Sequence, residues 1–431
     1  MFFIDDPEMT KHGYYITDTG IKTFSKYEAY IMAGKDWTKF KFIFNDHIYD
    51  QYDWTIEPEE DIYELYRQRA IQLREKYDYL VLMYSGGIDS TTIFNTFLDH
   101  GIKLDEACSF TTTDLDVKTN TLNQEVFNRA VPYFESVNTS LIGTKFRHIE
   151  IGRSLVDQWD DEFHYENFHH YANGSQWWAL TRSHKFKSLI KDHLTLSEQG
   201  KKICYIWGFD KPTVLRHKTG YAVAFPDMAV DLNSKQYVNR VLLKEKFANF
   251  YDEGFYITGD FPKISIKQGH MLVKLLKTIS NDDSRLKFGW ELPHTGPFVT
   301  HHQTDQIDRD GGFIYKFLDK RSVDGCIYPK ENINSFGMDK VGGSLIFSKR
   351  DNWFNKSDNK NKFRFDDKIR KMVKETPYYF SYTLKQENGY GFMDHFFEDE
   401  KYKNLIPKVG AGYFSKFYFI LKHTTEDIQH D

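Results

Sequence analysis

A continuous apolar run at residues 79–84, Tyr-Leu-Val-Leu-Met-Tyr, is followed almost at once by the glycine pair Gly86-Gly87. A run of this length without polar alternation is typical of a strand that is buried on both faces of a parallel sheet. Residues 90–99 then have the pattern of a helix, which Gly101 closes. A buried strand, a glycine turn and a helix form the first half of a βαβ unit, so this segment favours folds built on parallel strands.

The alternation of strands and helices continues on both sides of this segment. A helix with acidic residues in its first turn and one apolar stripe is expected at residues 57–78. Further strands are expected at 107–110, 146–151 and 203–207, with further helices at 122–134 and 177–194. This pattern predicts an α/β fold with a doubly wound, mostly parallel sheet.

The composition limits the class of protein. The 431 residues are 40% hydrophobic and 28% charged, which is enough apolar material for real cores and excludes wholesale disorder. Aromatic residues reach 17%, and we expect them to replace part of the usual aliphatic core. The formal net charge of −5 does not indicate a binder of polyanions.

The cysteines and the apolar segments exclude several further classes. Cys108, Cys204 and Cys326 lie far apart and form no CxxC pair. Such spacing argues against a disulfide framework, a cysteine zinc site and an iron–sulfur site. No apolar run approaches the length of a membrane span, and the N-terminus lacks the features of a signal peptide. We therefore expect a soluble, cytoplasmic protein with no membrane association.

The turn between the first strand and the first helix has the chemistry of a phosphate-binding loop. Its two glycines let the backbone approach a ligand closely, and the N–H groups at the start of the helix favour an anion. Its hydroxyl side chains can donate hydrogen bonds, and Asp89 can hold a magnesium ion that bridges phosphate oxygens. The sequence therefore predicts a polyphosphate site formed by Ser85, Gly86, Gly87, Ile88, Asp89, Ser90 and Thr91.

The string SGGIDS at residues 85–90 resembles the SGGxDS loop of the PP-loop, or N-type, ATP pyrophosphatase superfamily. The resemblance covers about residues 77–212 and is to the synthetase half of asparagine synthetases. The stretches YDYLVLMYSGGIDS, GFDKP and FPKISIKQGHMLVKLL also resemble uncharacterised asparagine-synthetase-like proteins of large tailed phages. The resemblance implies an adenine nucleotide alpha hydrolase-like fold, with ATP and Mg²⁺ as cofactors. It also implies cleavage of ATP to AMP and pyrophosphate, which activates a carboxylate or amide oxygen for attack by ammonia or an amine.

The resemblance implies roles for residues outside the loop. The adenine is expected near the end of the second strand, at Ser109 and Phe110. The stretch GFDKP resembles the Gly-x-Asp of asparagine synthetases, so Gly208 is expected at the nucleotide. By the same match, Asp210 is expected as a second magnesium ligand beside Asp89. A turn or helix-cap role is the alternative for Asp210.

The catalytic residues implied by the resemblance are Asp89 and a lysine, because a cation is needed to offset the charge on the departing pyrophosphate. Lys185 is one candidate, on the helix before the fourth strand, where asparagine synthetases also place a lysine. Lys267 is the other candidate, in the later part of the chain. A solvated helix face is the alternative for each lysine.

Absent features narrow the enzyme class further. Glutamine-dependent asparagine synthetases begin with a cysteine inside a glutaminase domain, whereas here Met1 is followed by Phe2. A built-in ammonia source is therefore not expected, and a separate source could supply the ammonia. We also expect a small-molecule acceptor. If the protein is phage-encoded, we expect it in the host cytoplasm. Two alternatives stay open. One is an enzyme that modifies a nucleic-acid base in tRNA or DNA by the same adenylation, and the other is a non-catalytic, ATP-binding regulator.

The regular alternation ends at about residue 235. A helix is expected at 270–279, loop signals dominate 281–365, and short mixed elements lead to an apolar segment at 413–421. We predict three parts: an N-terminal extension over 1–57, the ATP pyrophosphatase domain over 58–235, and a mixed α+β substrate or accessory domain over 236–431.

Overall fold

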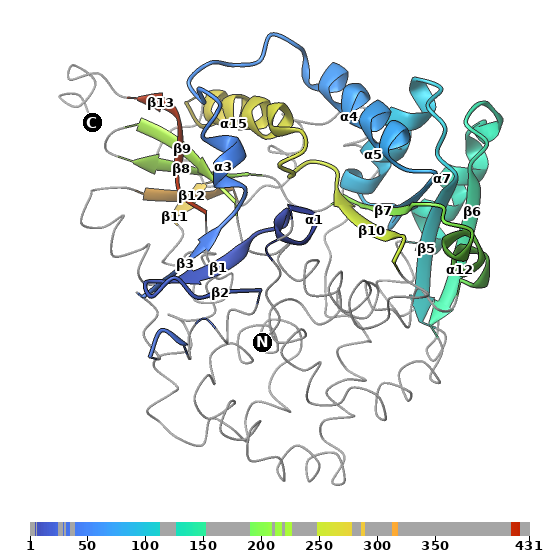
Figure 1. The fold of residues 1–431 in the computed structure, drawn as a ribbon. Coiled ribbons are helices and arrows are strands. Elements are labelled where there is room, and N and C mark those ends of the chain that lie inside the picture. The colour runs from blue at the N-terminus through green and yellow to red at the C-terminus, as the bar shows by residue number, and fades with distance from the viewer. Residues whose placement is uncertain are drawn as a thin grey trace, which may run out of the picture.

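The part of the chain that the computed structural model describes contains three β-sheets and the helices that pack on them (Figure 1). This part comprises residues 7–24, 39–112, 126–151, 190–208, 212–217, 220–225, 248–277, 286–288, 313–317 and 415–422, together with a few single positions between residues 5 and 34.

The central sheet is five-stranded and all parallel. Its strands are β4 (Tyr79–Met83), β5 (Glu106–Thr112), β6 (Lys145–Ile151), β7 (Ile203–Trp207) and β10 (Phe250–Gly254), in the order β10-β7-β4-β5-β6. With strands numbered along the chain this order is 3-2-1-4-5, as in Rossmann-like sheets, and the winding direction changes between β4 and β7. The predicted α/β class, the parallel sheet and the four predicted strands are confirmed.

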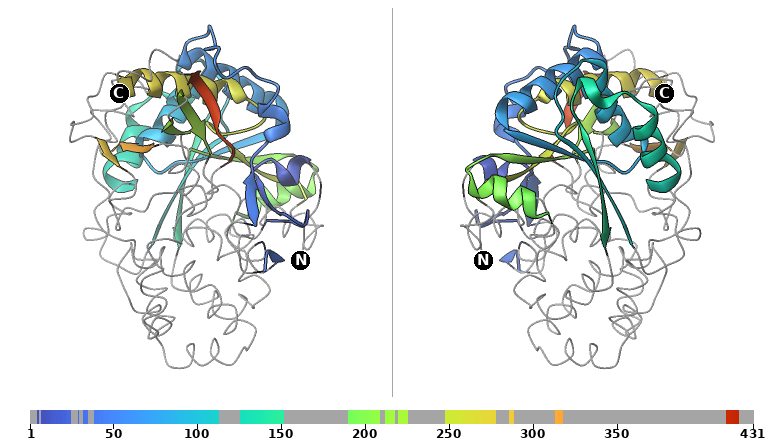
Figure 2. Two further views of the ribbon diagram at one scale, coloured as in Figure 1. Left: turned by 90° about the vertical axis from the view of Figure 1, so that its left-hand side faces the viewer. Right: turned by 90° about the vertical axis from the view of Figure 1, so that its right-hand side faces the viewer.

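Helices flank this sheet. They are α4 (Ile62–Lys76), α5 (Ile88–Asp99), the π-helical turn η1 (Val126–Ala130), α7 (Val131–Ser136) and α12 (Lys191–Glu198). A further helix, α15 (Pro262–Lys277), packs on α4 and on the antiparallel sheet described below. Figure 2 shows α7 and α12 on opposite sides of the sheet. The helix predicted over 177–194 lies mostly outside the described residues. Helix α12 begins at Lys191, after the non-helical Ile190, and overlaps the prediction only at 191–194.

The amphipathic pattern before β4 produces α4 as expected. The carboxylate of Asp61 accepts the N–H of Glu64 at 2.8 Å and caps the first turn. The apolar stripe of the helix, including Leu65, Ala70 and Leu73, is buried. Burial of this stripe, more than helix propensity, stabilises the helix.

The parallel sheet extends beyond residue 235, because β10 pairs with β7 from Phe250↔Ile203 to Gly254↔Trp207. A second five-stranded sheet is antiparallel, in the order β11-β12-β8-β9-β13. Its strands are β8 (Thr213–His217), β9 (Gly220–Ala224), β11 (Leu286–Phe288), β12 (Phe313–Phe317) and β13 (Tyr418–Lys422). Two strands thus lie in the stretch where loop signals dominate, and segments before and after residue 235 share both sheets. The three domain limits stay predictions.

The N-terminal residues form a small antiparallel sheet in the order β2-β1-β3. Its strands are β1 (Tyr14–Thr17), β2 (Lys22–Thr23) and β3 (Phe40–Ile43). The short helices α1 (Pro7–Thr10) and α3 (Asp46–Tyr49) precede and follow these strands in the chain. The strands are only two to four residues long, which explains why no long periodic pattern marks them in the sequence.

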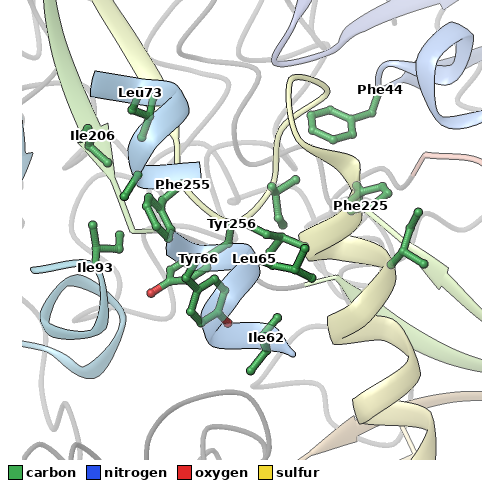
Figure 3. Packing of buried hydrophobic residues seen from close by; sticks show 14 of the residues in the cluster. Phe44, Ile62, Leu65, Tyr66, Leu73, Ile93, Ile206, Phe225, Phe255 and Tyr256 are labelled. Carbon is green, nitrogen blue, oxygen red and sulfur yellow. The ribbon is translucent and has the colours of Figure 1, made fainter. Parts of the chain in front are cut away.

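One hydrophobic core connects the three sheets (Figure 3). Phe44, after β3, lies 5.1 Å from Phe225, after β9, measured between ring centroids. Trp54 stacks on Tyr418 of β13 at 4.5 Å. In the described part of the chain many aromatic residues therefore fill core positions, as expected from the composition.

Candidate functional site

The predicted phosphate-binding loop lies at the carboxyl edge of the parallel sheet, between the end of β4 and the start of α5. The Tyr84 N–H donates to the carbonyl of Cys108 at 2.8 Å, and the Ser109 hydroxyl donates to the carbonyl of Tyr84. Both backbone groups of Tyr84 are therefore bonded to β5, so the loop leaves the sheet from a fixed point. Ser109, expected near the adenine, lies beside the loop and uses its hydroxyl on the loop backbone.

Gly86 gives the loop its sharp turn. Its φ of +79° lies in the left-handed region, which glycine adopts readily and other residues do not. A Cβ atom at this position would lie 2.8 Å from the backbone nitrogen of Ala130. The loop therefore packs against the end of η1 more closely than any side chain would allow.

The hydroxyl groups of the loop bond to each other and to the loop backbone. The Ser85 hydroxyl accepts the N–H of Gly87 at 3.2 Å and lies 3.2 Å from the Ser90 hydroxyl. The Ser90 hydroxyl also lies 3.2 Å from the Gly87 carbonyl, to which it donates. The two contacts between oxygens are longer than the usual range of about 2.5–3.0 Å for O–H···O bonds, and the N–H···O bond is at the long end of its range. An anion offers both hydroxyls and the N–H a stronger acceptor.

Thr91 differs from the two serines. Its side chain is fully buried, and its hydroxyl donates to the Tyr84 hydroxyl at 3.5 Å. Its backbone N–H closes the first turn of α5 on the Gly87 carbonyl at 2.9 Å. Thr91 thus fixes the start of the helix from within the core.

The start of α5 supplies backbone donors. Gly87 is the N-cap residue and has no side chain to accept an N–H of the first turn, so those donors are directed out of the helix. Asp89 lies in this first turn, and its side chain is partly exposed. Helix N-termini with uncapped N–H groups favour anions, and a nearby carboxylate suits a magnesium ion that accompanies phosphate.

Gly208, at the end of β7, lies against the same turn of α5. A Cβ atom on Gly208 would meet Ile93 Cδ1 at 2.9 Å and the Asp89–Ser90 peptide, with Asp89 C and Ser90 N both at 3.3 Å. β4 and β7 are the strands between which the winding direction changes, and ligands of doubly wound sheets bind outside the carboxyl ends of such strands. The structure therefore places Gly208 and the loop together at the switch point.

The remaining predicted site residues are described only in part. Lys185 and Asp210 lie outside the described residues, and Phe110 and Ile88 are described by their backbone alone. The ammonium group of Lys267 contacts Glu57 at 2.9 Å and the carbonyl of Pro58 at 2.9 Å. These contacts join α15 to the segment before α4, and the catalytic role of Lys267 stays a prediction.

A partly buried ionic cluster at the opposite edge of the sheet has no counterpart in the sequence analysis. Glu106, Asp192 and His193 place possible ligand atoms within 4.8 Å of one another. The guanidinium of Arg147 forms ion pairs with the carboxylates of Glu106 and Asp192, at 2.5 Å from each. The Nε2 atom of His193 lies 3.1 Å from the Glu106 carboxylate. Burial alone would raise the pKa of Glu106, but hydrogen bonds from His193 and Arg147 outweigh it and lower this pKa. A metal ion would have to displace the guanidinium, so the cluster has the chemistry of a structural ion pair.

No local sequence signal reveals this cluster, because Glu106 on β5, Arg147 on β6 and the Asp192–His193 pair on α12 are far apart in the chain and meet only in the folded structure. The same holds for Tyr256, after β10, whose hydroxyl donates to the carbonyl of Asp89 at 2.7 Å.

Comparisons with known proteins add no assignment. No model of a protein family matches the chain, and no curated protein matches it. Among the helices that the structure describes, none is both long and apolar enough to cross a membrane.

Proposed function

We propose that the protein is an AMP-forming, ATP-dependent ligase of the PP-loop type, with an adenine nucleotide alpha hydrolase-like nucleotide domain. One observation carries the proposal: the SGGIDS loop stands at the switch point of a 3-2-1-4-5 parallel sheet and leads directly into the N-terminus of α5. The proposed reaction is cleavage of ATP to AMP and pyrophosphate, which activates a carboxylate or amide oxygen for attack by ammonia or an amine.

The residues of the loop fit the polyphosphate of ATP. The Ser85 and Ser90 hydroxyls and the N–H groups of the first turn of α5 are donors, and Gly86 and Gly87 keep side chains out of the way. The carboxylate of Asp89 would hold Mg²⁺, which when bound supplies positive charge to the departing pyrophosphate. The chain's own contribution is then to bind and orient the phosphates, because adenylation needs positioning and electrostatic stabilisation more than proton transfer.

The acceptor is proposed to bind beyond the same edge of the sheet. All five strands are parallel, so the segments that follow β7 and β10 leave the sheet on the side of the loop. The net charge of −5 favours a small-molecule acceptor over tRNA or DNA. A separate ammonia source or a free amine would supply the nitrogen.

Product analysis tests the proposed reaction. The protein is incubated with Mg²⁺, ATP labelled at the α and γ phosphates, and separate pools of amino acids, nucleosides and tRNA. Formation of AMP and pyrophosphate, stimulated by a small-molecule pool, is the expected result. Stimulation by tRNA alone would favour the base-modifying alternative. Formation of ADP and phosphate, or ATP binding without cleavage, would refute the proposed reaction.

The variant Asp89→Ala tests the site. We expect the rate of magnesium-dependent pyrophosphate release to fall about a hundredfold or more, because the metal loses a ligand. The free energy of unfolding should fall by only about 0.5 kcal/mol, the usual value of an acidic residue in a first helical turn. Asp99→Ala, at the other end of α5, is the matched control and should keep wild-type turnover. Turnover of Asp89→Ala at the wild-type rate would show that Asp89 holds no catalytic metal.

A further inference from the structure

Tyr256 connects the segment after β10 to the first turn of α5. Its side chain is fully buried, and its hydroxyl donates to the backbone carbonyl of Asp89 at 2.7 Å. A buried tyrosine hydroxyl usually finds a hydrogen-bond partner, so the bond alone has no functional meaning. The bond is relevant to function because its acceptor is a peptide group in the first turn of α5.

That peptide group, Asp89–Ser90, is held from two sides. Tyr256 binds its oxygen, while the backbone of Gly208 lies against its carbon and nitrogen. The N–H of the same peptide belongs to the uncapped first turn of α5. A hydrogen bond to the carbonyl of a peptide polarises its N–H, which strengthens that N–H as a donor.

Tyr256 is itself fixed along its whole length (Figure 3). Its ring packs edge-on against Tyr66 of α4 at 5.4 Å and against Phe255 at 5.2 Å, between centroids. Its backbone carbonyl accepts the hydroxyl of Ser265, on α15, at 3.3 Å. The hydroxyl of Tyr256 therefore has little conformational freedom. Its contacts couple the position of the phosphate-binding loop to the positions of β10, α4 and α15.

We infer that Tyr256 is a positioning residue of the phosphate-binding loop: its hydroxyl holds the Asp89–Ser90 peptide against Gly208, so that the Ser90 N–H and the Asp89 side chain face the phosphates. The inference rests on the proposed function. Tyr256 lies in the core and acts through the backbone of α5, and we assign it no contact with the nucleotide.

The test uses the full-length chain with the variants Tyr256→Phe and Tyr66→Phe. Each loses one buried hydroxyl and keeps its ring, but the Tyr66 hydroxyl accepts a hydrogen bond from the side chain of Gln268, on α15, at 2.9 Å. Equilibrium binding of Mg-ATP and of inorganic pyrophosphate is measured, with thermal unfolding in parallel. We expect Tyr256→Phe to bind both ligands about tenfold more weakly and Tyr66→Phe to stay within about twofold of wild type.

A rescue experiment distinguishes a positioning role of the Tyr256 hydroxyl from a general effect on core packing. Replacement of Tyr256 by para-aminophenylalanine restores a donor at the same place and should restore affinity. Equal affinity of Tyr256→Phe and wild type, or equal loss in both phenylalanine variants, would overturn the inference and leave the proposed function standing. Absence of ATP binding by the wild-type chain itself would instead refute the proposed function and, with it, this inference.

Discussion

At the scale of single residues, Gly86 is the position that the loop geometry depends on most. Its backbone has a φ of +79°, and the backbone of Ala130 leaves no room for a Cβ atom. Glycine is therefore required for two independent reasons, conformation and contact. At Gly101 only the conformation favours glycine, because its φ is +60° and nothing lies within 4 Å of the position of a Cβ atom.

Gly86→Ala should therefore lower the free energy of unfolding by about 2–4 kcal/mol, because strain in φ adds to displacement of η1. Gly101→Ala, with strain alone, should cost about 1 kcal/mol. Urea unfolding of both variants measures the difference. Equal losses would show that the contact between the loop and η1 contributes nothing to stability.

His12 makes stability depend on pH. Its ring is buried, and Nε2 lies 3.0 Å from the carbonyl of Asp252, to which the neutral ring donates. Burial and the nearby Lys11 lower the pKa of His12 to about 4, although Glu253 and Asp252 act in the opposite direction. In the unfolded chain the pKa is about 6.5, so below that pH the unfolded state binds a proton that the folded state does not. The stabilisation is complete above pH 6.5 and is lost as the pH falls towards 4.

Between pH 6.5 and 4.5 this linkage should cost the wild-type chain about 2–3 kcal/mol of unfolding free energy. His12→Asn removes the titrating group and should flatten the dependence in that window, whatever its effect at neutral pH. Urea unfolding at several pH values measures the slope. An unchanged slope in the variant would mean that other groups cause the acid sensitivity.

At the scale of elements, the carboxylate of Glu253 joins β10 to two helical segments. It is fully buried and contacts Lys11 at 2.8 Å, Arg69 at 3.2 Å and Lys76 at 3.3 Å, and it accepts the hydroxyl of Tyr77. Burial would raise the pKa of Glu253, but the three cations outweigh it and hold the pKa well below its usual value. Lys11 follows α1, and the other two cations lie on α4, so one carboxylate orders three elements.

Glu253→Gln should lower the free energy of unfolding by about 3–5 kcal/mol, because buried cations lose their counter-charge. Glu64→Gln, which weakens the partly exposed pair with Arg67 on α4, is the control and should barely move the unfolding midpoint. Thermal and urea unfolding compare the two. Lys11 also contacts Glu8 at 2.9 Å, and Lys76 also contacts Asp260 at 2.8 Å. Similar small effects of the two variants would show that these contacts are sufficient for the lysines.

The elements that the sequence predicts correctly are those whose own residues carry the signal. β4 and β7 are continuous apolar runs, and α4 has an apolar stripe with a capping aspartate. β10 was missed because Asp252 and Glu253 interrupt its apolar pattern, and both are buried only through partners distant in the chain. α15 begins at Pro262, ahead of the helix predicted at 270–279. The prediction starts too late because Ile264 and Ile266 are β-branched and do not indicate a helix locally.

At the scale of the whole molecule, residues 1–57 share the core of the rest of the chain. Tyr49 stacks on Phe225 at 4.9 Å between centroids, and Lys11 supplies one of the cations around Glu253. The described residues of this segment therefore pack into the core that they share with the other two sheets, and its limits as a domain stay a prediction. Its removal would expose aromatic surface and leave a buried carboxylate with fewer partners.

A chain of residues 58–431 should for this reason lose cooperative thermal unfolding and bind a hydrophobic dye that the full-length protein does not bind. Near-ultraviolet circular dichroism, which reports packed aromatic residues, should weaken in parallel. A truncated chain with cooperative unfolding and wild-type ATP affinity would show instead that residues 1–57 form an independent unit.

The sequence by itself determined the parallel α/β class, the four strands at 79–84, 107–110, 146–151 and 203–207, and the loop over Ser85–Thr91. These features depend on residues that are neighbours in the chain, so local pattern and turn chemistry are sufficient to predict them. Only the tertiary structure decided that β10 completes the sheet, that Gly208 and Tyr256 hold the same peptide of α5, and that the three sheets share one core. Such contacts join residues far apart in the sequence, and their energies depend on burial and register, which no local pattern records.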